Sequence, residues 1–185
     1  EILDKRGIFF DKNRSVDITT SVTGTFTTEG WAVYKYTNLQ SNGEPGKNTT
    51  FPDTDFPMFR LGDVYLMYAE AVARGGEGGD LATAVNYINA LRERAYGDTY
   101  HNITESWLLE NNLQNILDER CRELYWEGVR RTDLIRFGLY TSPNYLWTFK
   151  GGVLNGVGVD SRYNVFPIPT TDMSVNDNLK QNEGY

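Results

Sequence analysis

The chain has 185 residues, of which 39% are hydrophobic, 23% charged and 14% aromatic. This composition is typical of a globular protein with a core and excludes a disordered chain. The net charge of −7 argues against nucleic acid as a partner, because phosphates require a basic surface. It also disfavours contact with anionic lipid through a polybasic patch.

Residue types that build reactive or membrane-bound structures are scarce. Cys121 is the single cysteine, which excludes an internal disulfide and a thiolate metal site, and its helical, apolar neighbours predict a small buried side chain. His101, the single histidine, is expected in a solvated loop, and one histidine removes most zinc-site and catalytic-triad interpretations. No stretch approaches the ~20 apolar residues of a membrane-spanning helix. The charged opening residues lack the pattern of a signal peptide.

The first segment, residues 1–58, is predicted to form loops and short strands. Alternating or β-branched residues at 16–18, 24–26 and 31–36 are typical of strands. Residues 40–50 are polar and rich in Asn and Gly, as expected for a loop.

Helical periodicity begins after Pro57. Residues 59–74 repeat apolar positions at helical spacing, and the glycine-rich run 75–79 ends that helix. Asp80 is expected to cap a second helix, and the short loop should fold the two helices antiparallel, like one tetratricopeptide (TPR) hairpin. The inward stripes are expected to contain Val64, Met67, Tyr68, Ala71 and Val72 in the first helix and Leu81, Ala84, Val85, Ile88, Leu91, Arg92 and Ala95 in the second.

Two more helices are predicted. One runs over residues 104–127, with Thr104 as its N-cap and Leu109 on its apolar stripe, and a short one runs over 130–137 and ends at Gly138. After residue 139 the helical period is lost.

Several motifs occur in one order along the chain. They are FPMFRLGDVYLMYAEA at 56–71, INALRERA at 88–95, ILDERCRELYWEG at 116–128, RRTDLIRFG at 130–138, FPIP at 166–169 and QNEGY at 181–185. Together they closely resemble the C-terminal signature of the SusD/RagB family, from about residue 51 to the end. The stretches 53–55 and 147–152 are similar to the starch-binding branch of that family.

The resemblance implies a mostly helical fold, a SusD-like α-superhelix fragment with one TPR-like helix pair, two further helices and irregular loops with short strands. In this interpretation the chain is the C-terminal portion of a single domain. Residues 1–58 are its loop- and strand-rich segment, 59–138 its helical core and 139–185 a wrapping segment.

The resemblance also implies a function. Members of the family have no enzymatic activity and require no cofactor. They bind glycan, are anchored through an N-terminal lipidated cysteine to the bacterial outer membrane, and cover a SusC-like TonB-dependent transporter. Because such a cysteine and the earlier helix pairs are not in this sequence, we expect a fragment of a longer member.

Carboxylates and arginines concentrate in residues 116–136. Glu119, Glu123 and Glu127 recur at a spacing of four, so they share one helix face and repel unless cations pair with them. A carboxylate held by arginine has a lowered pKa and is a poor general acid for glycoside hydrolysis. We therefore predict a structural ion-pair network that joins the third and fourth helices. Its expected members are Glu119, Arg120, Glu123, Arg131 and Asp133, with Arg122, Arg130 and Arg136 as further cations.

Aromatic side chains are the candidates for glycan contacts, because flat rings stack on the apolar faces of sugars. Trp31 and Tyr34 lie in the loop-and-strand segment and are the candidate glycan-binding residues. The alternative is packing, since strand alternation places Tyr34 and Tyr36 on the same face as Ala32. Trp107, Trp126 and Trp147 are expected in the core or between helices. In the starch-binding branch the principal platform lies upstream, which would leave the present residues as its floor or rim.

Asp53 and Asp55 form a D-x-D turn whose hard oxygen ligands suit calcium, and calcium is seen in the starch-binding branch. The alternative is an Asx-type cap before Pro57. Two other functions stay open: a glycosidase that uses two carboxylates ~5–10 Å apart, and a TPR-type scaffold that binds an extended peptide.

Overall fold

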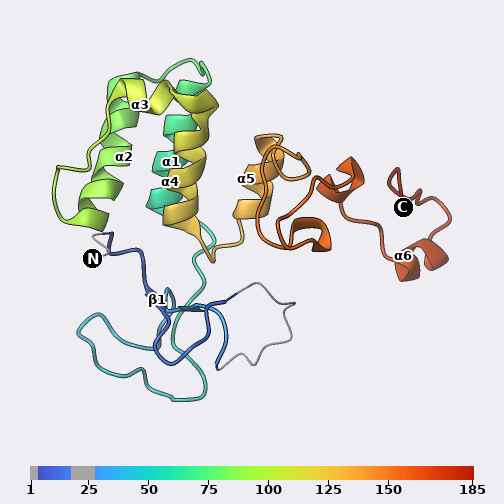
Figure 1. The fold of residues 1–185 in the computed structure, drawn as a ribbon, viewed down its shortest axis with the longest axis horizontal. Helices are drawn as coiled ribbons and strands as arrows, with labels where there is room; N and C mark the ends of the chain where they lie inside the picture. Colours follow the sequence, from blue (N-terminus) through green and yellow to red (C-terminus); the bar gives the residue numbers. More distant parts are fainter. Residues whose placement is uncertain (1–3, 18–27) are drawn as a thin grey trace. The chain divides into compact units, whose positions relative to one another are not determined.

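The computed structural model describes residues 4–17 and 28–185. The chain divides into two compact units: the first contains Glu1–Val16 and Thr27–Arg130, the second Asp17–Phe26 and Arg131–Tyr185. Most regular structure in the described residues is helical, as the sequence predicts (Figure 1). The predicted strand at 24–26 lies outside the described residues. Within them, no helix combines the length and apolarity that crossing a membrane would need.

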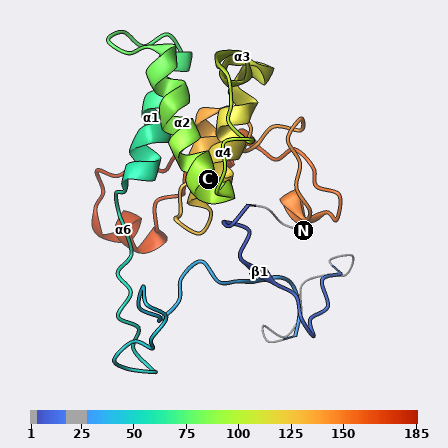
Figure 2. The same cartoon turned by 90° about the vertical axis from the view of Figure 1, so that its left-hand side faces the viewer.

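A helical hairpin is the centre of the first unit (Figures 1 and 2). It consists of α1 (Leu61–Ala73) and α2 (Leu81–Tyr96), which pack against each other as predicted. Asp80 caps α2, because its carboxylate accepts the Thr83 backbone N–H at 2.8 Å. The helix ends at Gly97, whose φ of +82° is a conformation that glycine adopts without strain.

The core of this unit lies where α1 and α2 meet the two helices that follow. Ala69 and Ala84 are fully buried, so their small side chains allow the hairpin helices to approach closely. Ala71, which was expected on the inward stripe, is exposed, as are Ala82 and Ala90. The buried cluster comprises Leu66, Ala69, Ala84, Ile88, Leu91, Ile103, Leu108, Ile116 and Leu124.

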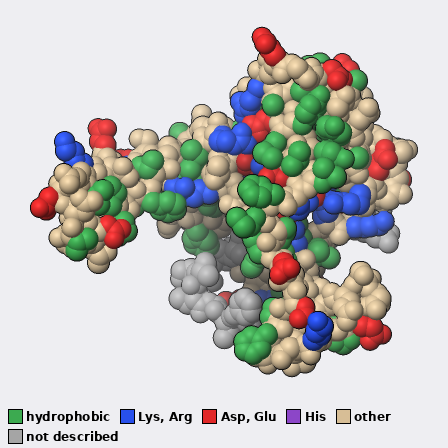
Figure 3. Space-filling model, turned by 180° about the vertical axis from the view of Figure 1, so that it is seen from behind, with side chains coloured by type: hydrophobic (Ala, Val, Ile, Leu, Met, Phe, Trp, Pro, Cys, Tyr) green, Lys and Arg blue, Asp and Glu red, His purple; other side chains and the backbone are tan. Residues whose placement is uncertain are grey.

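The outward face of α1 differs from the prediction. Val64 and Met67 were expected to point inward, but they are exposed, together with Leu61. The buried side chains of α1 include Leu66 and Ala69. Apolar residues occur on all sides of this helix, so periodicity alone could not select its inner face. Hydrophobic side chains accordingly gather at the surface of the helical part (Figure 3).

The predicted helix at 104–127 is interrupted. It consists of α3 (Glu105–Leu109), the 3-10 turn η1 (Asn111–Leu113) and α4 (Gln114–Leu124). All three residues of η1 have positive φ, between 50° and 62°. Asparagine tolerates this left-handed conformation, which ends a helix although the apolar period continues across it. Thr104 caps α3 as predicted, since its hydroxyl accepts the Trp107 N–H at 3.3 Å, but Leu109 is exposed.

The exposure of several single residues agrees only in part with the sequence prediction. Trp107 packs against the core as expected, whereas Trp126 is 65% exposed because its left-handed backbone follows the end of α4. Trp147 is also partly exposed. Cys121 is only half-buried. His101 stacks on Tyr96 with ring centroids 3.9 Å apart.

The second unit contains most of α5 (Arg130–Arg136), the 3-10 turns η2 (Lys150–Gly152) and η3 (Ser161–Asn164), and α6 (Thr170–Val175). The helix α5 matches the predicted fourth helix, but α6 was not predicted, because proline and polar residues mask its short period. Lys150 organises the loops here, since its buried ammonium donates to the carbonyls of Ser142 and Tyr145 at 2.6 and 2.7 Å.

Candidate functional site

Four aromatic side chains gather on a short antiparallel ribbon in the first unit. The strands β1 (Phe9–Phe10) and β2 (Ala32–Val33) pair with Phe9 opposite Val33 and Phe10 opposite Ala32. We call Phe9, Phe10, Trp31 and Tyr34 the aromatic ribbon. Each of its side chains is between 38% and 52% exposed. Both predicted glycan-binding residues therefore present ring surface to solvent.

The rings of the aromatic ribbon brace one another in pairs. Phe9 and Trp31 meet edge to face with centroids 6.4 Å apart, and Phe10 meets Tyr34 in the same way at 5.7 Å. This geometry holds Trp31 and Tyr34 in fixed orientations without burying them. Stacking platforms require that combination of rigidity and exposure. Phe9 and Phe10 had no sequence signal beyond being aromatic.

Tyr125 connects the aromatic ribbon to the C-terminal end of α4. Its ring lies 5.5 Å from that of Phe9, and its hydroxyl donates to the backbone carbonyl of Arg6 at 2.6 Å. The ammonium of Lys35 also contacts Tyr125, because it lies over the ring at 4.5 Å from the ring centroid. Tyr125 therefore joins the ribbon to the end of α4.

Three glutamates on α4 and just after it, Glu119, Glu123 and Glu127, have side chains that are only 0%, 1% and 6% exposed, and we call them the glutamate cluster. Glu119 has no exposed surface. It accepts from Arg6 at 2.8 Å, from Arg92 at 2.7 Å and from Arg122 at 3.2 Å.

Glu123 and Glu127 share the guanidinium of Arg60. Arg60 donates to a carboxylate oxygen of Glu123 at 2.6 Å and, through Nε, to Glu127 at 2.7 Å. Arg94 donates from Nη2 to both oxygens of Glu123 at 2.6 Å, and Lys35 donates to Glu127 at 2.5 Å. Every carboxylate of the cluster is therefore paired with at least two cations.

The pairing determines the protonation of these groups. Burial alone would raise the pKa of Glu123, but the hydrogen bonds from Arg60 and Arg94 outweigh it and hold that pKa below its ordinary value. The pKa of Glu127 is lowered in the same way, against burial, by Arg60 and Lys35. Burial lowers the pKa of Lys35 more than Glu127 raises it. Both carboxyls are consequently ionised at neutral pH.

The partners of the cluster differ from those that the sequence suggested. Of the expected cations, Arg122 contacts Glu119, whereas Arg120 pairs with Asp63 at 2.9 Å. Arg131 lies in the second unit, where it donates to the Tyr163 carbonyl at 2.8 Å. Asp133, also in the second unit, pairs with Arg136 at 2.9 Å. The remaining cations of the cluster are Arg6, Lys35, Arg60, Arg92 and Arg94.

These cations were missed because they come from other elements. Arg60, Arg92 and Arg94 stand inside motifs that carry the family resemblance, which was an available signal. Arg6 and Lys35 had none. That the network serves the structure rather than a ligand stays a prediction.

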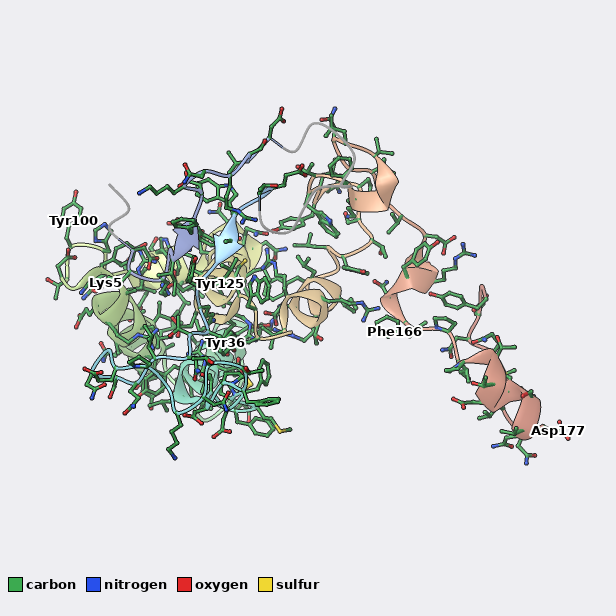
Figure 4. The ribbon with its side chains drawn as sticks, turned by 90° about the horizontal axis from the view of Figure 1, so that it is seen from below. Lys5, Tyr36, Tyr100, Tyr125, Phe166 and Asp177 are labelled. Carbon is green, nitrogen blue, oxygen red and sulfur yellow. The ribbon has the colours of Figure 1, made fainter. Side chains whose placement is uncertain are left out.

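A pocket of about 450 Å³ lies between the glutamate cluster and the end of α2. Five cationic side chains line it, and its two carboxylates are Glu123 and Glu127. Ile8, Pro57 and Tyr125 form apolar wall. We call it the basic pocket. Figure 4 labels Lys5, Tyr36 and Tyr125 from its lining and shows Lys5 beside α2.

Asp53 and Asp55, the predicted calcium ligands, lie in the loop before α1. Asp53 accepts the backbone N–H of Lys47, six residues earlier in the chain, at 2.8 Å. This bond closes the loop but is not an Asx-type cap, and α1 begins after Arg60 without a side-chain cap. Asp55 lines a smaller pocket of about 280 Å³. The described residues contain no group of three or more acidic, His or Cys side chains placed to hold a metal. Calcium binding here stays a prediction.

Comparison with known proteins places the fold and the motifs in one family. The family model described as the SusD family matches residues 12–185. The starch-binding protein SusD of Bacteroides thetaiotaomicron is 46% identical over 159 residues, covering 85% of this chain and 26% of that protein. The SusD-like protein P25 of Formosa agariphila is 33% identical over 132 residues, covering 69% of this chain and 24% of that protein.

A solved structure agrees with the fold. A SusD-like protein from Bacteroides fragilis superposes with a TM-score of 0.52 at 24% identity, covering 76% of this chain and 28% of that one. The mostly helical architecture predicted from the sequence is confirmed. This chain belongs to the SusD family. It spans about a quarter of the length of the relatives it matches.

Proposed function

We propose that this chain is part of a non-catalytic glycan-binding protein whose aromatic ribbon contacts the sugar. Membership of the SusD family supports a glycan as the ligand. The relative named as a starch-binding protein favours starch or a related polysaccharide. The observation that carries the proposal is the exposure of Trp31 and Tyr34 on rings that brace each other. Rings held in this way stack on a pyranose with little loss of conformational entropy.

The glutamate cluster supports a role without catalysis. A glycosidase needs one carboxyl that stays protonated near neutral pH and faces a second one across a cleft. The cations around Glu123 and Glu127 instead lower the pKa of both groups. The cluster then acts as a rigid support for the aromatic ribbon, and the protein binds and releases the sugar without cleaving it.

We further propose the cellular role that the family resemblance implies. The full-length protein is a lipoprotein of the outer membrane that captures glycan at the cell surface and delivers it to a SusC-like TonB-dependent transporter.

The test compares the sugar affinity of the full-length protein after removal of exposed aromatic side chains inside and outside the ribbon. Calorimetry with maltooligosaccharides should show affinity about threefold to tenfold weaker for Trp31→Ala and Tyr34→Ala, the range expected for one lost aromatic contact. The matched control is Trp126→Ala, which removes a more exposed tryptophan outside the ribbon.

Three outcomes would contradict parts of the proposal. An equal loss of affinity in the Trp126→Ala control would show that the ribbon is not the sugar-binding site. Release of reducing ends from the sugar would indicate a glycosidase, and binding of an extended peptide in place of any sugar would indicate a TPR-type scaffold.

A further inference from the structure

The basic pocket has a charge opposite to that of the whole chain. Five of its lining side chains are cationic and two are acidic, in a chain whose net charge is −7. Both carboxylates are already held by arginine or lysine. The pocket therefore attracts a further negative charge, and its volume of about 450 Å³ lies in the range of small-ligand sites.

Its cations divide into those with every donor used and those with donors to spare. The Lys35 ammonium donates to the carbonyls of Glu123 and Tyr125 and to the carboxylate of Glu127, which uses its three hydrogens. Arg6 is likewise bound on both sides, by Asp4 and by Glu119. Arg60 is bound in the same way, by Glu123 and Glu127, so these three cations belong to the support.

Lys5 and Arg94 have donors to spare. In the described part of the chain, the Lys5 ammonium has no hydrogen bond or ion pair, and Arg94 donates only from Nη2. The two residues are neighbours in space, because the Lys5 backbone N–H donates to the carbonyl of Ala95 at 2.9 Å. The Lys5 ammonium lies beside Gly97 at the C-terminal end of α2, and the Lys5 and Arg94 side chains both line the pocket.

A second feature of the pocket is an unpartnered donor. The Tyr36 hydroxyl is buried and has no hydrogen-bond partner among the described residues. Burial raises the pKa of this hydroxyl, and Glu127 adds to the effect, so it remains protonated and can only gain by meeting an acceptor. A ligand with polar oxygens would supply that acceptor.

We propose that the basic pocket binds a sugar unit that carries one negative group, a carboxylate or a sulfate ester, with Lys5 and Arg94 on the anion. The proposal rests on the proposed function only in that the ligand is a sugar. Phe9 of the aromatic ribbon packs on Tyr125, which lines the pocket. One glycan chain can therefore stack on the ribbon and place a charged unit in the pocket.

The experiment is calorimetry on the full-length protein at low salt with three sets of oligosaccharides. Oligogalacturonate carries carboxylates, sulfated galactan oligomers carry sulfate esters, and unsubstituted galactan oligomers carry no charge. We expect at least one charged set to bind about tenfold more tightly than the uncharged one, with an advantage that shrinks in salt. The set that binds identifies the anionic group.

Variants connect this preference to the pocket. Lys5→Met and Arg94→Met should each reduce the affinity for the charged set by about threefold to tenfold. Tyr36→Phe should weaken binding of the same set. The matched control is Lys47→Met, which removes an exposed lysine of the same unit outside the pocket. Because Arg94 also pairs with Glu123, melting temperatures accompany each measurement, and Lys5→Met keeps the test independent of that ion pair.

The proposal is overturned if charged and uncharged sets bind equally, or if Lys5→Met binds the charged set like the control. In either case, binding of maltooligosaccharide through Trp31 would leave the proposed function intact. Absence of binding to every neutral and charged sugar would remove both.

Discussion

The glutamate cluster and the aromatic ribbon lie in one unit and meet at Tyr125, yet their side chains differ in burial and in the number of partners. In the cluster, Glu119 and Glu123 are buried and their oxygens accept from several cations. In the ribbon, Trp31 and Tyr34 touch one partner ring each and keep half of their surface in solvent. Buried charge must be fully paired to be tolerated, whereas binding surface must remain unpaired to be useful.

The largest expected effect tests the cluster. Glu123→Ala leaves Arg60 and Arg94 without their shared carboxylate at a site where that side chain is 1% exposed. Breaking one partner out of a buried network destabilises a protein by about 3–5 kcal/mol. Denaturant unfolding measures this loss, and Glu77→Ala in the exposed glycine-rich loop is the control. Affinity of the folded variant for uncharged maltooligosaccharide should be nearly unchanged. Lost affinity at an unaltered melting temperature would erase the contrast between cluster and ribbon.

The second largest expected effect is a loss of stability of the glutamate cluster at acidic pH. The pKa values of Glu123 and Glu127 lie below their ordinary value of 4.5 in the folded protein. Their contribution to stability is therefore complete above the unfolded pKa and is lost as pH falls through the folded one. Melting temperature should hold steady above about pH 5.5 and then decline toward pH 3. Glu123→Gln should flatten this decline, and an equally steep curve in that variant would place the acid-sensitive groups elsewhere.

The smallest of these effects concerns Arg131 in the second unit. Its guanidinium donates to the Tyr163 carbonyl and lies over the rings of Tyr140 and Phe166, 5.1 and 4.1 Å from their centroids. Arg131→Ala should cost about 1–2 kcal/mol in urea unfolding, since cation–π contacts and single hydrogen bonds are modest near the surface.

Arg131→Lys sharpens that measurement. It keeps the charge but loses the planar contact with the rings, so it should recover little of the stability. Full recovery by lysine would mean that charge alone matters, and a loss as large as that of Glu123→Ala would make the two regions equivalent.

Local signals in the sequence determined much of the helical hairpin. The glycine-rich run ends α1 and Asp80 begins α2, because capping and backbone freedom act within a few residues. The order of motifs was sufficient to identify the SusD family, which the comparisons confirm. Trp31 and Tyr34 are exposed in the structure, and their contact with sugar stays a prediction.

Tertiary structure alone decided which side chains meet. Arg6 and Lys35 reach the glutamate cluster from more than eighty residues away along the chain, and no periodicity encodes such a distance. The outward face of α1 was also settled by packing, since the apolar pattern allowed other choices. Helix ends depend on neighbours in sequence, whereas ion pairs and inner faces depend on neighbours in space.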